Sequence, residues 1–401
     1  MLNAREAALE ALSAYRRRGA RPEMVVSGAD ASDKDVALAT NIVLGVLQNE
    51  YYLDFCIEAS SGRRMSRLEP VVAEILRIGA YQLLFLTRIP RSAAVNESVK
   101  LCKQHSRNAA GLANAVLRNL KAEKTDDLSI KYSHPRWLVD ELIREYGEEK
   151  AERILYYDNL PRKTTLIANP LRSADLTALE RHPEMENAYL FSGAVEKLEA
   201  FTLGAVYAQD MSAYLAAAEA QPKPGDTVLD ACAAPGGKSF ACAGLMKNEG
   251  KIYSRDIHEK KLRLIKSGAE RLGIDIIETE AFDASKPDER LREACDVVIC
   301  DVPCSGMGVI AKKPEIRYKP ESELSRLPEV QLRILSAQSE AVRKGGTLVY
   351  STCTILSGEN GGVVEKFLEK HGNFEKITEK TILPSENCDG FYICRMRKKS
   401  T

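Results

Sequence analysis

Two cysteines of this 401-residue chain stand where strands are expected to end, and they are its strongest sign of chemistry. Cys304 follows the predicted strand Val297–Asp301, and Cys353 follows the predicted strand Thr347–Ser351. Ligands of open α/β sheets bind at the carboxyl ends of the strands, so neighbouring strands would bring both thiols to one pocket. Many cysteines are only small, buried hydrophobes. We adopt that interpretation for Cys242, Cys295 and Cys300.

A cysteine hydrolase is the first chemistry that such thiols could indicate. It requires a base, usually histidine, within hydrogen-bond reach of the sulfur. Neither cysteine motif contains a histidine, and the nearest in sequence are His258 and His371. The ten cysteines form no C-x-x-C pair, so a zinc site is not expected either.

Three aspartates follow three successive predicted strands. Asp230, Asp256 and Asp283 stand at the ends of the first, second and third strands of the second half of the chain. An acid at the end of the second strand can bind both hydroxyls of a ribose. Asp283 suits the surroundings of an adenine amino group. Each aspartate alone could be a helix cap, but together they predict a nucleoside site.

The loop after the first of these strands consists of small residues and leads into a helix. Small residues let the backbone approach a ligand, and a helix N-terminus favours an anionic group. The loop is not G-x-G-x-x-G, and Cys232 stands where a phosphate loop needs its first glycine, which disfavours a nucleotide triphosphatase. A tight turn without a ligand is the alternative. The predicted ligand-binding residues of the loop are Cys232, Ala233, Ala234, Pro235, Gly236, Gly237 and Lys238.

The elements that would position these residues alternate between strands and helices. This alternation over residues 206–401 predicts an α/β domain with a parallel sheet covered on both faces. Two further strands close the domain. The predicted strands are Thr227–Ala231, Lys251–Arg255, Ile274–Ala281, Val297–Asp301, Thr347–Ser351, Phe374–Leu383 and Gly390–Met396.

The first 125 residues have helical patterns only. Ser32-x-x-Asp35 is a helix start of the capping type, and Pro70 opens a helix with an apolar face. We therefore expect an all-α domain over 1–125. Residues 126–205 begin with a polar linker and continue with mixed helix and strand patterns, which predicts a linker and a small α+β connector.

Composition and charge exclude several classes of protein. Hydrophobic residues make up 44% and charged residues 28% of the chain, which is typical of globular domains. No apolar stretch of about 18 residues is present, so we expect a cytoplasmic protein without a membrane span. With 57 basic and 57 acidic residues the formal charge is zero, and basic clusters are read first as solvated surface.

The motifs of the second half resemble those of the Nop/Sun family of S-adenosylmethionine-dependent RNA cytosine-C5 methyltransferases. The resemblance covers about 205–396, and Val302 departs from the alanine usual there. The residues that carry it are Cys232–Lys238, Asp301–Ser305, Ser351–Cys353, Glu359–Asn360 and Asp389–Tyr392. The resemblance implies a Rossmann-like fold, S-adenosylmethionine as cofactor, and no metal.

The first domain is similar to the RNA-binding antitermination protein NusB. The similarity rests on three stretches, Ile89–Pro90, Val95–Val99 and Ala113–Arg118. A NusB-like domain ahead of this methyltransferase domain resembles bacterial enzymes that act on small-subunit (16S) ribosomal RNA. The implied partner is therefore RNA, most simply 16S ribosomal RNA, bound by a monomer.

The resemblance also implies a role for each reactive residue. Cys353 is the nucleophile that adds to carbon 6 of cytosine and so activates carbon 5, and Cys304 assists release of the product. Asp301 bonds the cytosine edge and belongs to the cofactor contacts, with the 232–238 loop, Asp256 and Asp283. The target base must be unpaired or flipped. Basic clusters, including Lys312-Lys313 with Arg317, then become candidate phosphate contacts.

Three other functions remain open from the sequence. The same chemistry could act on transfer RNA. The chain could be a NusB-like RNA-binding assembly factor with an inactive enzyme domain, although its cysteine pair and aspartates are intact. A small-molecule or protein methyltransferase is the third alternative, and it would not need two thiols.

Overall fold

Capping residues fix the ends of the first long helices in the computed structural model, which describes residues 2–400, apart from the side chain of Glu23. Asn3 and Glu6 form a capping box at the start of α1 (Ala4–Arg18), and Gly19 ends it in the left-handed conformation. Ser32 accepts a hydrogen bond from the backbone N–H of Asp35 at the start of α3 (Asp33–Ser61). The predicted helix start at Ser32 is therefore confirmed.

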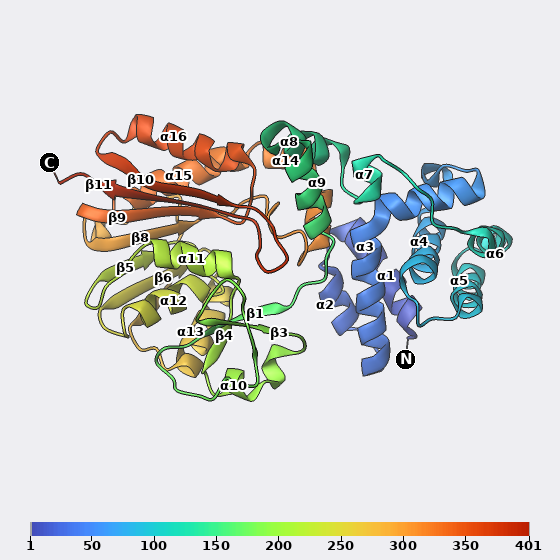
Figure 1. Cartoon of the computed structure of the whole chain (residues 1–401), viewed down its shortest axis with the longest axis horizontal. Coiled ribbons are helices and arrows are strands. Elements are labelled where there is room, and N and C mark those ends of the chain that lie inside the picture. Colours follow the sequence, from blue (N-terminus) through green and yellow to red (C-terminus); the bar gives the residue numbers. More distant parts are fainter. Residues whose placement is uncertain (1, 401) are drawn as a thin grey trace. The chain divides into compact units, whose positions relative to one another are not determined.

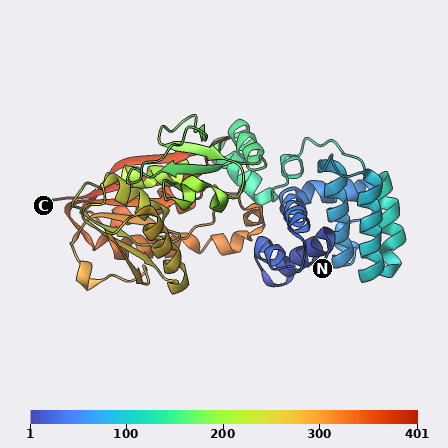
Figure 2. The same ribbon diagram turned by 90° about the horizontal axis from the view of Figure 1, so that it is seen from below.

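The chain divides into two units, residues 1–159 and 160–401. The first unit is entirely helical. Helices α4, α5 and α6 run side by side, as the turned view in Figure 2 shows. The remaining elements of this unit are α2 (Pro22–Ser27), η1 (Met65–Arg67), α4 (Pro70–Phe85), α5 (Arg91–His105), η2 (Arg107–Ala109), α6 (Ala110–Asn119), α7 (Leu128–Lys131), α8 (Arg136–Tyr146) and α9 (Glu148–Tyr157).

The boundary between the units falls inside the segment 126–205 that we expected to be one connector. Its helical part belongs to the first unit, because Ser133 accepts a hydrogen bond from the backbone N–H of Tyr51 and Gln48 donates to the carbonyl of Asn159. Its strand part belongs to the second unit. The domain boundaries 1–125, 126–205 and 206–401 remain a prediction.

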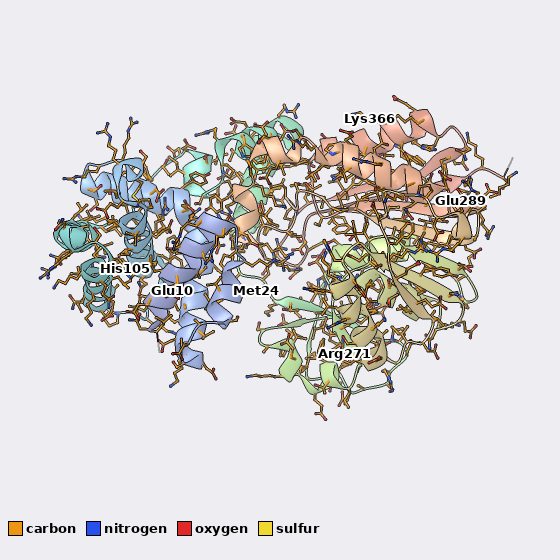
Figure 3. The ribbon with its side chains drawn as sticks, turned by 180° about the vertical axis from the view of Figure 1, so that it is seen from behind. Glu10, Met24, His105, Arg271, Glu289 and Lys366 are labelled. Carbon is orange, nitrogen blue, oxygen red and sulfur yellow. The ribbon has the colours of Figure 1, made fainter. Side chains whose placement is uncertain are left out.

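The strand part of that segment forms a small antiparallel sheet in the order β2-β3-β1-β4. Arg271, labelled in Figure 3, fastens a neighbouring helix to it by donating to the carbonyls of Phe201 (2.6 Å) and Val206 (3.0 Å). The elements of this part are β1 (Thr164–Ala168), β2 (Glu180–Arg181), β3 (Ala188–Phe191), η3 (Val195–Lys197), α10 (Glu199–Thr202) and β4 (Val206–Ala208).

A seven-stranded sheet in the order β10-β11-β9-β8-β5-β6-β7 forms the centre of the second unit. Its five strands β5 to β9 are parallel, and β10 and β11 are antiparallel additions at one side. These strands are β5 (Thr227–Asp230), β6 (Lys251–Asp256), β7 (Ile277–Ala281), β8 (Cys295–Asp301), β9 (Val342–Thr352), β10 (Phe374–Ile382) and β11 (Phe391–Lys398).

Helices cover both faces of this sheet, as predicted (Figure 1). One face packs against α11 (Met211–Glu219), α12 (Gly237–Leu245) and α13 (Glu259–Leu272), and the other against α15 (Leu327–Ser339) and α16 (Gly361–Lys370). Along β8, Val297 and Ile299 belong to the first core and Val298 and Cys300 to the second. This alternation is the two-residue period of a strand buried on both faces. The short helical turns of this unit are η4 (Glu289–Leu291), η5 (Pro314–Tyr318), α14 (Glu321–Leu324) and η6 (Ser357–Glu359).

Two strands begin more than two residues away from the start that the sequence predicted, and the other bounds differ by two residues at most. The third strand begins at Ile277 rather than Ile274, because Gly273 ends α13 with φ +72° and Ile274 still bonds back to the carbonyl of Ala269. The fifth strand extends from Val342 to Thr352, since Val342 pairs with Cys295 of β8 across an irregularity in the register that precedes Thr347.

Candidate active site

The carboxyl ends of the parallel strands meet at one edge of the sheet and bring the predicted site residues together there. Strands β8 and β9 are direct neighbours, with Asp301 in register with Ser351. Cys304 and Cys353 therefore emerge side by side. Their sulfur atoms are 3.2 Å apart, and both residues are half-buried. One thiol can hydrogen-bond to the other.

The hydrogen bond between the thiols raises the pKa of Cys304 and lowers the pKa of Cys353. Burial also raises the pKa of Cys304, whereas the cations Lys238 and Lys313 lower the pKa of Cys353. These influences favour ionisation of Cys353 over that of Cys304, and a Cys353 thiolate would accept a hydrogen bond from the Cys304 thiol. A thiolate is the nucleophilic form of cysteine.

Asp301, the last residue of β8, accepts hydrogen bonds on both carboxylate oxygens. Lys238 donates to one at 2.6 Å and Ser351 to the other at 2.9 Å. The amino group of Lys238 also lies 5.2 Å from the centre of the Phe391 ring. The sequence placed Lys238 with the cofactor loop, but its side chain points to Asp301 beside the thiols.

A polar network supports the loop that carries Cys304. The backbone N–H of Ser305 donates to Glu359 (2.9 Å), and the Ser305 hydroxyl donates to that of Thr354 (2.8 Å). Gln331 of α15 donates to the carbonyl of Pro303 and to Glu359. Connected hydrogen bonds between buried groups restrict the conformations that those groups can adopt, so this network keeps Cys304 next to Cys353, even though the other Glu359 oxygen, Oε1, has no hydrogen-bond partner.

A cavity of about 480 Å³ opens beside the same edge of the sheet. Cys232, Asp256 and Asp283 line it, as the nucleoside hypothesis expected. Among the described residues, the other predicted cofactor residues (Ala233–Lys238 and Asp301) are not in its lining. Lining residues that the sequence did not single out as ligand contacts include Ile257, Lys261, Phe282, Ala284, Ser285, Val330, Arg333 and Ile334.

The cavity combines two acids with apolar walls and two cations. Asp256 accepts a hydrogen bond from the backbone N–H of His258 (2.9 Å), and Lys261 lies 3.7 Å from the same oxygen. Asp283 accepts from the backbone and hydroxyl of Ser285, which lower its pKa. Carboxylates can accept hydrogen bonds from ribose hydroxyls, and apolar walls suit an adenine. These acceptors and walls fit S-adenosylmethionine.

Asp230 has a different role from the other two strand-end aspartates. It is fully buried, and Ser239 of α12 donates to it at 2.7 Å. Ser254 of β6 donates in turn to the Ser239 hydroxyl at 2.7 Å. Burial raises the pKa of Asp230 to about 6. The residue therefore fastens α12 and β6 behind the loop rather than lining the cavity.

The loop between β5 and α12 turns at a glycine that no other residue could replace easily. Gly236 has φ +117°, and a Cβ there would lie 2.5 Å from the ring of Phe240. Only glycine reaches this conformation without strain. The tight turn places the start of α12 and the amino group of Lys238 beside β8.

The basic residues after Cys304 are less available for contact with RNA phosphates than the sequence implied. Lys312 forms ion pairs with Asp210 and Asp389, and Arg317 is fully buried. Lys313 is exposed. Of the two exposed lysines, Lys312 already pairs with two carboxylates, so Lys313 is the stronger candidate for phosphate contact.

The described residues contain neither a candidate membrane span nor a candidate metal-ion cluster. No helix in residues 2–400 has the length and apolarity to cross a membrane. In the same part of the chain, no cluster of three or more His, Cys, Asp or Glu side chains could hold a metal ion.

Comparisons with known proteins match both halves of the chain. Residues 217–397 match the family described as 16S rRNA methyltransferase RsmB/F, and residues 2–122 match the NusB family. A probable ribosomal RNA small subunit methyltransferase B of Bacillus subtilis is 38% identical over 98% of both chains. One of Synechocystis is 31% identical over 99% of this chain and 100% of its own length.

A solved structure has a similar fold over about two thirds of the chain. It is a methyltransferase homologue from Pyrococcus horikoshii, 25% identical, with a TM-score of 0.60. The alignment covers 68% of this chain and 98% of that one.

Proposed function

Because the chain belongs to the RsmB/F family of 16S ribosomal RNA methyltransferases, we propose that it methylates carbon 5 of a cytosine in that RNA through a covalent cysteine adduct. Its cofactor is S-adenosylmethionine. The observation that carries the cytosine chemistry is the pair of thiols 3.2 Å apart. Methylation of an oxygen or an amine does not need such a pair.

The residues of the chain activate a carbon that is otherwise a poor nucleophile. The Cys353 thiolate adds to carbon 6 of the cytosine, and the ring becomes an enamine that is nucleophilic at carbon 5. Lys238 and Lys313 favour the thiolate, and the proton stays on Cys304. Asp301 is placed beside the thiols to bond the cytosine edge as charge develops.

When bound, S-adenosylmethionine supplies an electrophilic methyl group. Asp256 would hold its ribose, Asp283 would lie at its adenine, and the loop at Cys232 would face the rest of the molecule. Once carbon 5 is methylated, its proton must leave and the bond between carbon 6 and the Cys353 sulfur must break. Cys304 is near enough to accept this proton once it has given up its own, and the electron pair of the C–H bond then restores the ring double bond as the Cys353 sulfur leaves as a thiolate.

Replacement of each cysteine in turn tests the proposed order of events. Cys353→Ala should abolish methylation and form no covalent species. Cys304→Ala should still attack but fail to release its RNA, giving a slow band in a denaturing gel that the double variant lacks. Cys102→Ala, in the first unit, is the matched control and should behave like the unaltered chain.

The outcomes of that experiment separate the alternatives. A trapped complex with Cys353→Ala instead would reverse the two roles. Full activity in both variants would leave the thiols as packing residues and refute the mechanism. Bisulfite sequencing of ribosomal and transfer RNA from a deletion strain would then identify the substrate, and an unchanged pattern in both would favour an inactive assembly factor.

A further inference from the structure

We propose that Lys312 is a positioning residue for this reaction, which clamps the loop after Cys304 to the segment before β11 and thereby fixes the wall beside Cys353. The inference rests on the proposed function, because it assigns Lys312 to the same active site. It replaces the phosphate contact that the sequence implied for this lysine.

The amino group of Lys312 joins three segments that are far apart in the sequence. It lies 2.7 Å from a carboxylate oxygen of Asp210, the N-cap of α11, and 2.7 Å from one of Asp389. The backbone N–H of Asp389 donates to the second oxygen of Asp210 at 3.2 Å. The side chains of Asp210 and Asp389 are only 10% and 5% exposed, so the two carboxylates are shielded from water, while the Lys312 side chain is 34% exposed.

A short path of backbone hydrogen bonds leads from the clamp to the nucleophile. Gly390, next to Asp389, donates to the carbonyl of Gly308 at 2.7 Å. Gly308 in turn donates to the carbonyl of Cys353 at 3.0 Å. A Cβ on Gly308 would lie 2.1 Å from the Gly390 oxygen, so the two backbones touch directly. A shift of the 308 or 390 segment therefore moves the Cys353 backbone.

The same clamp sets the position of Phe391, which follows Gly390. The Phe391 ring lies 5.2 Å from the amino group of Lys238, and Lys238 bonds to Asp301. The Phe391 ring and the Lys238 side chain both lie beside the thiols. Loss of the clamp would loosen the contacts beside Cys304 and Cys353, where the cytosine would bind. The cofactor cavity has a separate lining.

Without Lys312, two buried carboxylates would face one another. Arg162 is the other cation near Asp389, and it stands 3.8 Å away. Burial and Asp210 raise the pKa of Asp389 to about 6, against the pull of Lys312 and Arg162. Burial opposes ionisation of Asp210 too, but Lys312 lowers its pKa to about 2. The clamp is thus fully charged only above about pH 6.

The groups that face Asp389 come from four segments. They are Asp210 at α11, Lys312 after Cys304, Arg162 before β1, and Cys388 in its own segment; His182 bonds the adjacent carbonyl of Asn387. Of the carboxyl and thiol groups in this set, Asp389 is the one whose pKa lies at about 6.

The test compares Lys312→Met with Lys312→Arg in the full chain. Lys312→Met should lower kcat for RNA methylation about 10- to 100-fold, because small misplacements of reacting groups have effects of this size. Affinity for S-adenosylmethionine should stay within about twofold, and Lys312→Arg should restore most of the rate. Lys380→Met is the control, because the exposed Lys380 forms an ion pair with Glu219, a residue that takes no part in the clamp.

A pH profile separates positioning from a merely structural role. The rate of the unaltered enzyme should fall below about pH 6, as Asp389 takes a proton and leaves the clamp. Asp389→Asn should be slow at every pH and lack this step. It keeps the shape of the side chain, so it also serves if Lys312→Met does not fold.

Alkylation of Cys353 by iodoacetamide, located by mass spectrometry, gives a readout that does not depend on methylation. Lys312→Met should change this rate, whereas Lys380→Met should not. A wild-type kcat together with a wild-type alkylation rate in Lys312→Met would overturn the clamp. Absence of 5-methylcytosine with the unaltered chain would instead refute the proposed function, and the alkylation rates would still decide the clamp.

Discussion

Asp256 and Asp283 share a cavity, but their carboxylates have different surroundings. The Asp256 side chain is 10% exposed and that of Asp283 is 36% exposed. A charged hydrogen bond contributes more where water is excluded. Asp256 should therefore contribute more to cofactor binding than Asp283.

Replacing Asp256 by alanine should weaken S-adenosylmethionine binding by about 1–3 kcal/mol, the usual size for loss of a hydrogen bond to a charged group. Asp283→Ala should have a smaller effect. Isothermal titration calorimetry measures both. Equal affinities for Asp256→Ala and the unaltered chain would contradict the assignment of Asp256 to the ribose.

Ionisation of Cys353 gives a second prediction at this scale. The hydrogen bond from Cys304 and the cation Lys238 lower its pKa below the ordinary thiol value of 9.0. Its alkylation rate should therefore reach a plateau at a lower pH than that of a free thiol, and Lys238→Met should move the plateau to higher pH. An unchanged profile would show that Lys238 does not act on the sulfur.

The sequence predicted where the two thiols lie better than it predicted where the side chains around them point. Cys304 and Cys353 could be predicted because a strand end is visible in the pattern of apolar residues. The direction of Lys238 could not, because it depends on how the Gly236 turn starts α12. The buried role of Asp230 also needed the structure, since a strand-end acid looks the same in sequence whether it faces a ligand or Ser239.

At the scale of elements, close contact between two loops makes Gly308 irreplaceable. A Cβ there would lie 2.1 Å from the Gly390 oxygen, which is backbone and cannot swing aside. Gly308→Ala should lower the free energy of unfolding by about 1–3 kcal/mol, as overpacking does. Gly372→Ala is the control, since a Cβ there meets nothing within 4 Å. Urea denaturation of both variants checks this, and equal midpoints would contradict it.

Whether a segment forms a helix or a strand was easier to predict than which elements lie next to one another. Alternating strands and helices predicted the covered parallel sheet. The order β9-β8-β5-β6-β7, which makes Cys304 and Cys353 neighbours, depends on packing between segments far apart in the chain. The length of α3 was also hidden, because Asn49 departs from helical geometry within it and interrupts its apolar pattern.

At the scale of the molecule, a formal charge of zero hides local concentrations of charge. In the first unit, Arg91, Arg118 and Lys121 line a cavity of about 470 Å³. Among the described residues of that lining there is no acid. A basic patch of this kind is a candidate contact for RNA phosphates.

Neutralising that patch should reduce the salt dependence of RNA binding. Each lost phosphate contact lowers the slope of log K against log salt by about 0.7–0.9. We therefore expect a shallower slope for the double variant Arg118→Gln, Lys121→Gln in the full chain. Arg144→Gln is the control, because Arg144 is exposed and already paired with Glu141. Equal slopes would remove this patch from the RNA surface.

Composition predicted several domains, but contacts decided how the middle of the chain is shared. The polar residues after 121 resemble a linker in sequence. In the structure the helices that follow pack on α3, as the bond from Tyr51 to Ser133 shows. Such contacts join residues about 80 positions apart, and no local pattern reports them.

The position of β11 in the large sheet has a consequence for how the protein is made. This strand, Phe391–Lys398, pairs with β9 on one side and β10 on the other, although it is the last strand described. A ribosome must therefore release residue 398 before the sheet can finish assembling, whereas the helical unit emerges much earlier. Asp389 and Phe391 arrive with that strand. Nascent chains stalled before residue 389 should thus have a folded first unit and no methyltransferase activity.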